Sequence, residues 1–287
     1  GRRGGGAVRL ITYRRGGDDG YGVVSGDGVV ACGPLVGAEA PTLRSALEGG
    51  LLGRLAELTD GRPADFPLAD LTLLPPIPEP RKILCIGVNY VAHRDEARQG
   101  EQTHPPIFTR FADSQVGHGQ PVHRPVASDR LDYEGELAVI IGSPVRGATE
   151  ADALSAVAGY SCFNDYSVRD WQRHSTQWIP GKNFTGVGSF GPFLVTADEV
   201  GDPSLLTLET RVNGEVRQQA PVKDMIFDVP QLIAYISTFT QLSPGDVIAT
   251  GTPSGVAAYM SPPAWLKPGD VVEVDIPRVG LLRNTIA

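Results

Sequence analysis

The chain contains the stretch LDYEGELAVIIG, in which two glutamates stand at the entrance of an apolar strand. The run from Leu137 to Ile141 is apolar and rich in β-branched residues, which indicates a strand buried on both faces. Side chains two apart in a strand project to the same face, so Glu134 and Glu136 point the same way. Ala138 and Ile140 continue that face into the core. Two like charges at the edge of a core cost several kcal/mol unless something neutralises them.

Composition limits the classes of protein to which the chain can belong. Its 287 residues suffice for one large or two modest domains, and its net charge of −8 argues against a nucleic-acid or membrane partner. No apolar run approaches the roughly 18 residues that span a bilayer. The opening GRRGGG has no apolar signal region behind it and is expected to be a flexible tail. Isolated Cys32, Cys85 and Cys162 indicate buried reduced thiols in a cytoplasmic protein.

A proline-rich segment, LLPPIPEPRK, divides the sequence. Residues 1–76 are expected to form a small N-terminal α/β domain, and residues 77–287 the larger catalytic domain. Leucines at helical spacing between residues 42 and 61 predict one helical stretch in the smaller domain. Short strands separated by glycine-rich turns are predicted before it, at Val8–Tyr13, Tyr21–Val24 and Val29–Ala31.

Beyond this segment the signals are mostly those of strands. KILCIGVNY predicts a buried strand, and Asn213-Gly214 between two alternating runs predicts a hairpin. Two helices are predicted, one from Thr149 to Ala158 with Gly159 as its stop, and one that begins near Asp228. Because regular βαβ alternation is missing, the pattern predicts an α+β, strand-dominated fold.

A third acidic residue, Asp165, follows the strand signal in GYSCFNDYSVRDWQ. A βαβ-like run through the predicted helix could return the chain beside its own start and bring Asp165 to Glu134 and Glu136. Three carboxylates without a thiolate suit a hard divalent cation, Mg²⁺ or Mn²⁺, with Ca²⁺ as a further option. The alternative is that the glutamates form salt bridges or lie on a solvated edge strand.

Two further segments offer groups that could bind an anionic substrate. Arg169, Gln172 and Lys182 follow the third acid and supply hydrogen-bond donors for an oxyanion or a carboxylate beside the metal. The segment GTPSGV supplies the Thr252 hydroxyl and backbone amides from Gly251 onward, which suit an anionic group. Taken alone, GTPSGV is also an ordinary turn.

A candidate general base lies upstream, in NYVAHRDEARQG. His93 and Glu96 are one helical turn apart there, a spacing that lets a carboxylate orient an imidazole. A solvated charged helix is the alternative interpretation of the same stretch.

Five motifs occur in order between Lys82 and about Val256: GVNYVAHRDEA, DYEGELAVIIG, GYSCFNDYSVRDWQ, PGKNFTGVGSFGPF and PGDVIATGTPSGV. Together they resemble the fumarylacetoacetate hydrolase family. The resemblance implies a catalytic domain built as a mixed β-roll or β-sandwich, a homodimer, and Mg²⁺ or Mn²⁺ held by Glu134, Glu136 and Asp165.

The resemblance also implies roles for individual residues. Arg169, Gln172 and Lys182 would contact the developing oxyanion of the substrate. His93 with Glu96 matches a water-activating pair that many members carry on a mobile lid.

Two more positions are implied to contact the substrate, a small 2-oxo or dicarboxylic acid. Thr252 matches a contact to the substrate carboxylate. Arg110, in PPIFTRFADS, stands where relatives often carry lysine and is expected to face the pocket.

The predicted activity is hydrolysis of a C–C bond in an acylpyruvate-type 2-oxo acid, through a metal-stabilised enolate. The same chemistry serves isomerisation or decarboxylation of 2-oxo and 2-hydroxydienoic acids and hydration of 2-oxo-enoates, so these reactions stay open. The presence of both His93 and Glu96 favours hydrolysis. A non-catalytic metal-binding scaffold is the alternative from another class.

Two other enzyme classes are disfavoured. GVGSFG matches the G-x-G-x-x-G motif of dinucleotide-binding proteins, but a proline and a strand signal follow it where a helix should begin. No G-x-S-x-G elbow is present, and Ser189 has no convincing histidine and aspartate context. The sequence therefore favours neither an NAD(P)-dependent oxidoreductase nor a serine hydrolase.

Overall fold

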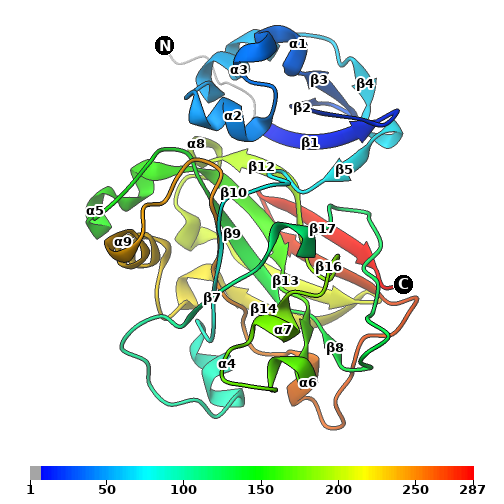
Figure 1. Ribbon diagram of the computed structural model, residues 1–287, viewed down its shortest axis with the longest axis vertical. Coiled ribbons are helices and arrows are strands. Elements are labelled where there is room, and N and C mark those ends of the chain that lie inside the picture. The colour runs from blue at the N-terminus through cyan, green and yellow to red at the C-terminus, as the bar shows by residue number, and fades with distance from the viewer. Residues whose placement is uncertain (1–7) are drawn as a thin grey trace.

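The computed structural model describes residues 8–287 (Figure 1), so the expected glycine-rich tail lies outside the described residues. A large sheet of eleven strands forms the centre of the described part, with β5 (Thr72–Leu74) paired to β1 beside the main path. Along that path the order is β4 (Phe66–Pro67), β3 (Gly28–Ala31), β2 (Asp18–Ser25), β1 (Arg9–Arg15), β12 (Ser189–Thr196), β10 (Val157–Asn164), β9 (Gly135–Ile141), β15 (Val247–Ala249), β6 (Ile83–Ile86) and β7 (Ile107–Thr109). The predicted strand-dominated α+β fold is confirmed.

The first part of the chain is a small α/β unit at the top of Figure 1. Its three predicted strands are present as β1, β2 and β3, and the short helix α1 (Gly33–Val36) follows them. The prediction of one helical stretch was wrong, because the chain forms two helices, α2 (Leu43–Glu48) and α3 (Leu52–Thr59). Gly50 between them adopts φ +67°, a left-handed conformation that ends the first helix.

The sheet and the core both continue past the proline-rich segment. β1 pairs with β12, so the strands of the small unit extend the central sheet. One buried cluster also reaches from Leu43 and Leu47 of α2 to Ala138 and Ile140 of β9. The domain division near residues 76 and 77 falls between β5 and β6 and stays a prediction.

β9 is buried along its whole length, as predicted. Ala138 and Ile140 belong to the cluster on one face, whereas Leu137, Val139 and Ile141 belong to the cluster on the other. The second cluster also contains residues of α9 (Val229–Phe239) and of a four-stranded antiparallel sheet. That sheet has the order β14 (Glu215–Pro221), β13 (Thr207–Val212), β16 (Val271–Ile276) and β17 (Gly280–Thr285).

The predicted hairpin and one predicted helix are confirmed, and the other helix is shorter than predicted. Asn213 and Gly214 join β13 to β14 with φ of 51° and 80°, and the Asp228 side chain caps α9. The helix predicted to end at Gly159 ends earlier, as α5 (Glu150–Ala153) followed by a 3₁₀ turn. Gly159 lies in β10 instead, where a Cβ would stand 2.1 Å from the Val195 carbonyl oxygen.

Four strand ends meet at one edge of the large sheet. β15 runs parallel to β6 and antiparallel to β9, and β10 is antiparallel to β9 rather than joined to it as a βαβ unit. The start of β9 therefore lies beside the ends of β10, β15 and β6. Short elements flank this edge: β8 (Leu131–Asp132), β11 (Ser167–Val168), α4 (Val91–Glu96), α6 (Arg169–Gln172) and α7 (Ile179–Lys182).

The remaining helix of the larger part is α8 (Ala197–Val200). Among residues 8–287, no helix has the length and apolarity that crossing a bilayer requires. The segment after GVGSFG enters β12, so it does not open the helix that a dinucleotide-binding motif needs.

The three cysteines are buried and unpaired, as predicted. Burial raises the pKa of Cys32 to about 11 and raises the pKa of the Cys85 and Cys162 thiols further above the ordinary value.

We therefore expect the native protein to release no chromophore from a thiol-reactive disulfide reagent at about pH 8, because it holds no accessible thiolate. After denaturation it should release three equivalents. Rapid labelling of the native protein would contradict this arrangement of the core.

Candidate metal centre and active site

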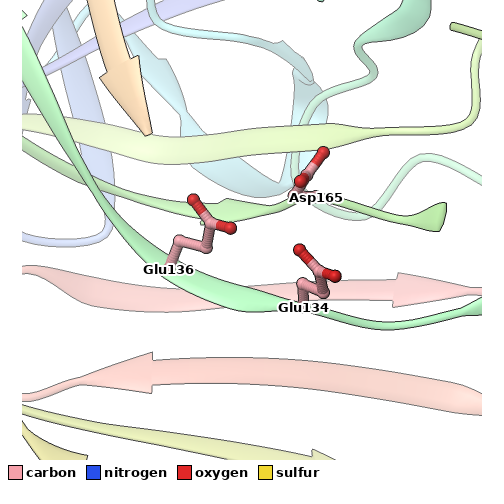
Figure 2. Close-up of side chains that lie close together, drawn as sticks. All are labelled: Glu134, Glu136 and Asp165. Atoms are coloured by element: carbon pink, nitrogen blue, oxygen red, sulfur yellow. The ribbon is translucent and has the colours of Figure 1, made fainter. Parts of the chain in front are cut away.

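Three acidic side chains converge where β9 begins and β10 ends. Glu134, Glu136 and Asp165 each offer an oxygen, and these oxygens lie within 4.8 Å of one another. Figure 2 shows the three carboxylates turned toward a common point. The register pairs Asn164 with Gly135, and the Asp165 N–H donates to the Glu134 carbonyl at 2.9 Å, which fixes the two strand ends together. The prediction that the chain returns Asp165 to both glutamates is confirmed.

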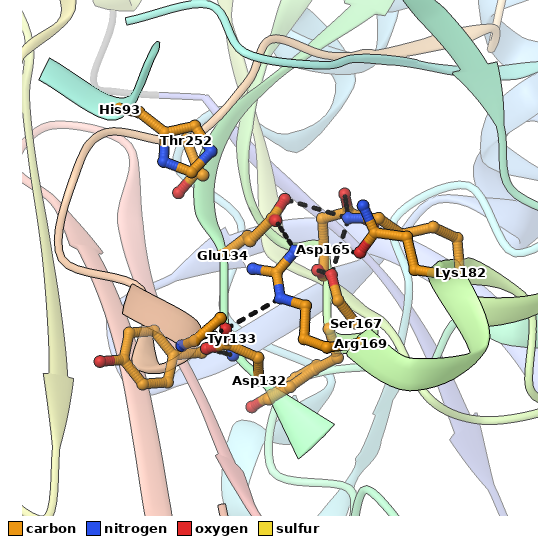
Figure 3. Close-up of polar contacts among 12 residues, drawn as sticks. His93, Asp132, Tyr133, Glu134, Asp165, Ser167, Arg169, Lys182 and Thr252 are labelled. Atoms are coloured by element: carbon orange, nitrogen blue, oxygen red, sulfur yellow. Dashed lines mark hydrogen bonds and ion pairs between the residues drawn. The ribbon is translucent and has the colours of Figure 1, made fainter. Parts of the chain in front are cut away.

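Lys182 contacts both Glu134 and Asp165, and Arg169 contacts Glu134 (Figure 3). Lys182 Nζ lies 2.6 Å from Asp165 Oδ2 and 3.1 Å from Glu134 Oε2, and it donates to Ser167 Oγ at 2.7 Å. Arg169 Nη1 lies 2.7 Å from Glu134 Oε1. Burial raises the pKa of Glu134, but the charges of Lys182 and Arg169 outweigh burial and lower it to about 2.

Glu136 is the member of the triad that lacks a basic partner. Its Oε2 accepts from the Gly251 N–H at 3.0 Å, and no lysine, arginine or histidine among residues 8–287 forms an ion pair with it. Burial, together with the negative charges of Asp165 and Glu134, raises the pKa of Glu136 well above its usual value. Three oxygen donors with an uncompensated negative charge fit a hard divalent cation. The residues present therefore suit the predicted metal.

The backbone N–H of Gly251 donates a hydrogen bond to this carboxylate cluster. The sequence predicted a contact between Gly251 and substrate. The register of β15 with β9, in which Ala249 pairs with Ala138, places Gly251 opposite Glu136. Gly251 adopts φ +101°, and a Cβ there would stand 2.7 Å from the Cβ of Asn89. Its N–H is already used by Glu136, and a role for Gly251 in binding substrate stays a prediction.

Thr252 lines the candidate cavity, but its hydroxyl has protein partners. The Thr252 Oγ1 donates to the Gly135 carbonyl at 2.9 Å and accepts from Gln218 Nε2 at 2.8 Å. These contacts tie the GTPSGV loop to the start of β9. A role for Thr252 in binding substrate stays a prediction.

The predicted histidine–glutamate pair is formed on α4. His93 Nδ1 lies 2.9 Å from Glu96 Oε1, and the Glu96 carboxylate also accepts from the Gly255 N–H at 3.2 and 3.3 Å. The ring of Tyr259 meets the His93 ring edge-on, with 6.2 Å between centroids. The imidazole is thus held in place from both sides, and the alternative of a solvated helix does not apply to it.

One cavity of about 280 Å³ joins these groups. Among the residues named so far, its lining includes His93, Glu134, Arg169, Gln172, Lys182, Thr252 and Tyr259. Gln172 Oε1 accepts from Arg169 Nη1 at 3.0 Å, whereas the buried Arg169 Nη2 has no hydrogen-bond partner within the described residues. Arg169, a cavity-lining residue, therefore has one buried donor whose hydrogen-bonding capacity is unused within the described residues.

Arg110 does not line this cavity, so the prediction that it faces the pocket was wrong. Its side chain is fully buried and its Nη1 lies 2.6 Å from Asp165 Oδ1, with a second bond to the Tyr166 carbonyl at 2.7 Å. Its Nη2 donates to the Val187 carbonyl. Its Nε also donates to Ser114 Oγ at 3.3 Å, so all of its contacts are internal and Arg110 holds the Asp165 carboxylate from the side away from the cavity.

Asp132 is a residue that the sequence reasoning missed. Its buried carboxylate lies 2.9 Å from Arg169 Nε and accepts from the N–H groups of Ala257 and Ala258 at 2.8 and 2.9 Å. It thereby connects Arg169 to the 3₁₀ turn Ala257–Tyr259, which carries Tyr259 over His93. The alternation D-x-E-x-E could have revealed it, because Asp132 continues the period-two spacing of the glutamates.

Comparison with known proteins agrees with this geometry. A family model for the C-terminal domain of fumarylacetoacetate (FAA) hydrolase matches residues 82–287. The chain belongs to this family. The predicted recognition and fold are therefore confirmed.

Two similar proteins of known name are mitochondrial oxaloacetate tautomerases. The mitochondrial oxaloacetate tautomerase fahd2 of Xenopus laevis is 42% identical over 220 residues, which cover 76% of this chain and 69% of that protein. The mitochondrial oxaloacetate tautomerase FAHD2A of Homo sapiens is 40% identical over 223 residues, covering 77% and 71%. Both of these relatives are named for the same activity.

Solved structures extend the likeness to almost the whole chain. The fumarylacetoacetate hydrolase of Exiguobacterium antarcticum has a TM-score of 0.82 and 35% identity, and the match covers 97% of this chain and 99% of that one. The maleylpyruvate hydrolase of Sphingobium sp. SYK-6, solved with manganese(II) ion and pyruvate, has a TM-score of 0.81 and 32% identity, with coverage of 97% and 98%.

We expect Glu136→Gln to raise the melting temperature of the metal-free protein and to abolish its stabilisation by Mn²⁺. A raised carboxyl pKa means that the folded metal-free protein loses stability as pH rises above the ordinary glutamate value, and glutamine removes that penalty. Thermal unfolding at about pH 7.5, with and without Mn²⁺, measures both effects. Glu215→Gln, on the exposed hairpin, is the control. Equal Mn²⁺ stabilisation of Glu136→Gln and wild type would contradict the assignment.

We expect Asp132→Asn to lower the free energy of unfolding by about 3 kcal/mol, because Arg169 Nε and the Ala258 N–H would face an amide nitrogen. Urea unfolding measures the loss. The control is Asp170→Asn, since Asp170 accepts from Ser128 Oγ and has no arginine partner within residues 8–287. If both variants lose the same free energy, Asp132 does not hold Arg169 in the way described.

Proposed function

We propose that this chain is a divalent-metal-dependent enzyme that interconverts the keto and enol forms of a small 2-oxo dicarboxylic acid, with oxaloacetate as the first substrate to test. One observation carries the proposal: Glu134, a member of the buried triad, lines the same cavity of about 280 Å³ as His93. That volume lies just below the roughly 300–1,000 Å³ of pockets for drug-sized ligands, which favours a substrate of few carbon atoms. The relatives named oxaloacetate tautomerase support the same reaction.

We infer that Mg²⁺ or Mn²⁺ would be held by Glu134, Glu136 and Asp165. All three ligands are carboxylate oxygens, which these cations prefer. When bound, the cation supplies Lewis-acid stabilisation of the negative charge that develops as a proton leaves the carbon beside a carbonyl. The maleylpyruvate hydrolase solved with manganese supports this choice of metal.

His93 would carry the proton. Its Nδ1 is bonded to Glu96, which leaves Nε2 as the ring nitrogen that can accept a proton from the substrate. In the keto-to-enol direction His93 removes a proton from C3, and a proton is returned to the oxygen on C2, so the substrate keeps its composition. The free Nη2 donor of Arg169 would stabilise the oxygen on which charge develops.

The predicted hydrolysis of an acylpyruvate C–C bond is a second candidate. The His93–Glu96 pair could take the proton from water instead of from carbon, and the maleylpyruvate hydrolase with a TM-score of 0.81 supports this alternative. Both reactions need stabilisation of the negative charge that develops on the oxygen of a 2-oxo acid. Decarboxylation belongs to the same group of reactions.

We further propose a homodimer, as the family resemblance implies. The cytoplasmic location stays a prediction, supported by three free buried thiols. The tautomerase relatives, in contrast, are named as mitochondrial proteins.

The decisive test follows the enol absorbance of oxaloacetate in Mg²⁺, Mn²⁺ or excess chelator. We expect metal-dependent acceleration in the wild type and a loss of about 100-fold or more in His93→Asn. His104→Asn is the matched control, because His104 is exposed, packs on Tyr235 and does not line the cavity.

Equal rates in wild type and His93→Asn would contradict the proposal. Release of pyruvate from maleylpyruvate or acetylpyruvate, without effect on oxaloacetate, would assign the chain to the hydrolases. If metal binds and neither reaction occurs, the predicted alternative of a non-catalytic scaffold is favoured.

A further inference from the structure

The cavity wall carries an arginine that the proposed proton transfer does not use. Arg173 directly follows α6, four residues after Arg169, and both side chains line the cavity, as does Gln172. Residues at spacings of three and four share one helical face, so α6 directs a row of polar groups at the ligand space. Arg173 is the outermost of this row, because it is exposed whereas Arg169 is buried.

Arg173 differs from its neighbours in having no acidic partner. Arg169 pairs with Asp132 and Glu134, and Arg94 on the nearby α4 pairs with Asp95. No aspartate or glutamate within residues 8–287 forms an ion pair with Arg173, and its side chain makes no hydrogen bond to that part of the chain. A guanidinium on a cavity wall without a protein partner is available to an anionic ligand.

We propose that Arg173 binds a second carboxylate of the substrate and thereby selects 2-oxo dicarboxylic acids over 2-oxo monocarboxylic acids. The inference rests on the proposed function, in which the 2-oxo acid end of the substrate lies at the carboxylate triad. Glu134 and Arg173 line one cavity of about 280 Å³, so a short diacid meets the triad at one end and the guanidinium at the other.

The polar groups around Arg173 agree with this selection. Gln99 and Ser175 line the same cavity and are uncharged. The lining residues include one carboxylate, Glu134, which pairs with Arg169 and Lys182. A second substrate carboxylate at Arg173 therefore meets a cation and neutral groups and avoids like-charge repulsion.

The test compares two ligands that differ in one carboxylate, 2-oxoglutarate and 2-oxopentanoate. Both carry the same 2-oxo acid end and the same number of carbons, and neither is a β-keto acid. Calorimetric titration into Mn²⁺-loaded protein gives their dissociation constants for wild type, Arg173→Gln and Arg146→Gln. Arg146 is the matched control, since it is exposed, does not line the cavity and loses the same charge.

We expect the wild type and Arg146→Gln to bind the diacid more tightly than the monoacid. Arg173→Gln should raise the dissociation constant of the diacid about ten-fold, as loss of a charge-assisted hydrogen bond does. The dissociation constant of the monoacid should stay within about two-fold of the wild-type value. An unchanged preference in Arg173→Gln would overturn the inference and leave the proposed function intact. If the wild type binds neither ligand, the proposed function itself fails, and the inference with it.

Discussion

The structure depends on the neutralisation of a buried cluster of carboxylates. Four buried acids are connected at the edge of the sheet, and three buried cations pair with them. The acids are Asp132, Glu134, Glu136 and Asp165, and the cations are Arg110, Arg169 and Lys182. One carboxylate is left without a basic partner, and an unpaired charge in a protein interior is strongly unfavourable. A bound divalent cation would neutralise this cluster, and the proposed chemistry requires the same cation.

Much of this centre can be predicted from residue patterns that act locally. Because side chains alternate with a period of two along a strand, Glu134 and Glu136 lie on the same face. The apolar run beyond them predicts that β9 is buried. The helical spacing of three likewise fixes the contact between His93 and Glu96. The position of Asp165 follows from a short connection that returns the chain beside its own start. Each of these inferences needs only backbone geometry and hydrophobic patterning.

The sequence predicts contacts least well where packing between segments far apart in the chain determines them. Gly159 looks like a helix stop, but β12 approaches so closely that only glycine fits there in β10. Arg110 and Gly251 both contact metal-binding carboxylates from outside the cavity, and their direction depends on pairings with residues 55 and 115 positions away. Asp132 was missed because its role lies in joining Arg169 to a backbone turn 125 positions away. The D-x-E-x-E spacing places Asp132 on the face of the two glutamates, but a single sequence does not give the distant partners of these side chains. Family resemblance locates the site without assigning each side chain its partner.

The central claim is that a divalent cation completes the buried carboxylate cluster, and anomalous diffraction from crystals soaked in Mn²⁺ tests it most directly. The account predicts one manganese peak per chain, within coordination distance of oxygens from Glu134, Glu136 and Asp165. It also predicts that Lys182 Nζ moves away from at least one of the two carboxylates that it now contacts. A fully soaked crystal without a peak at the triad, or with its strongest peak at another site, would contradict the account.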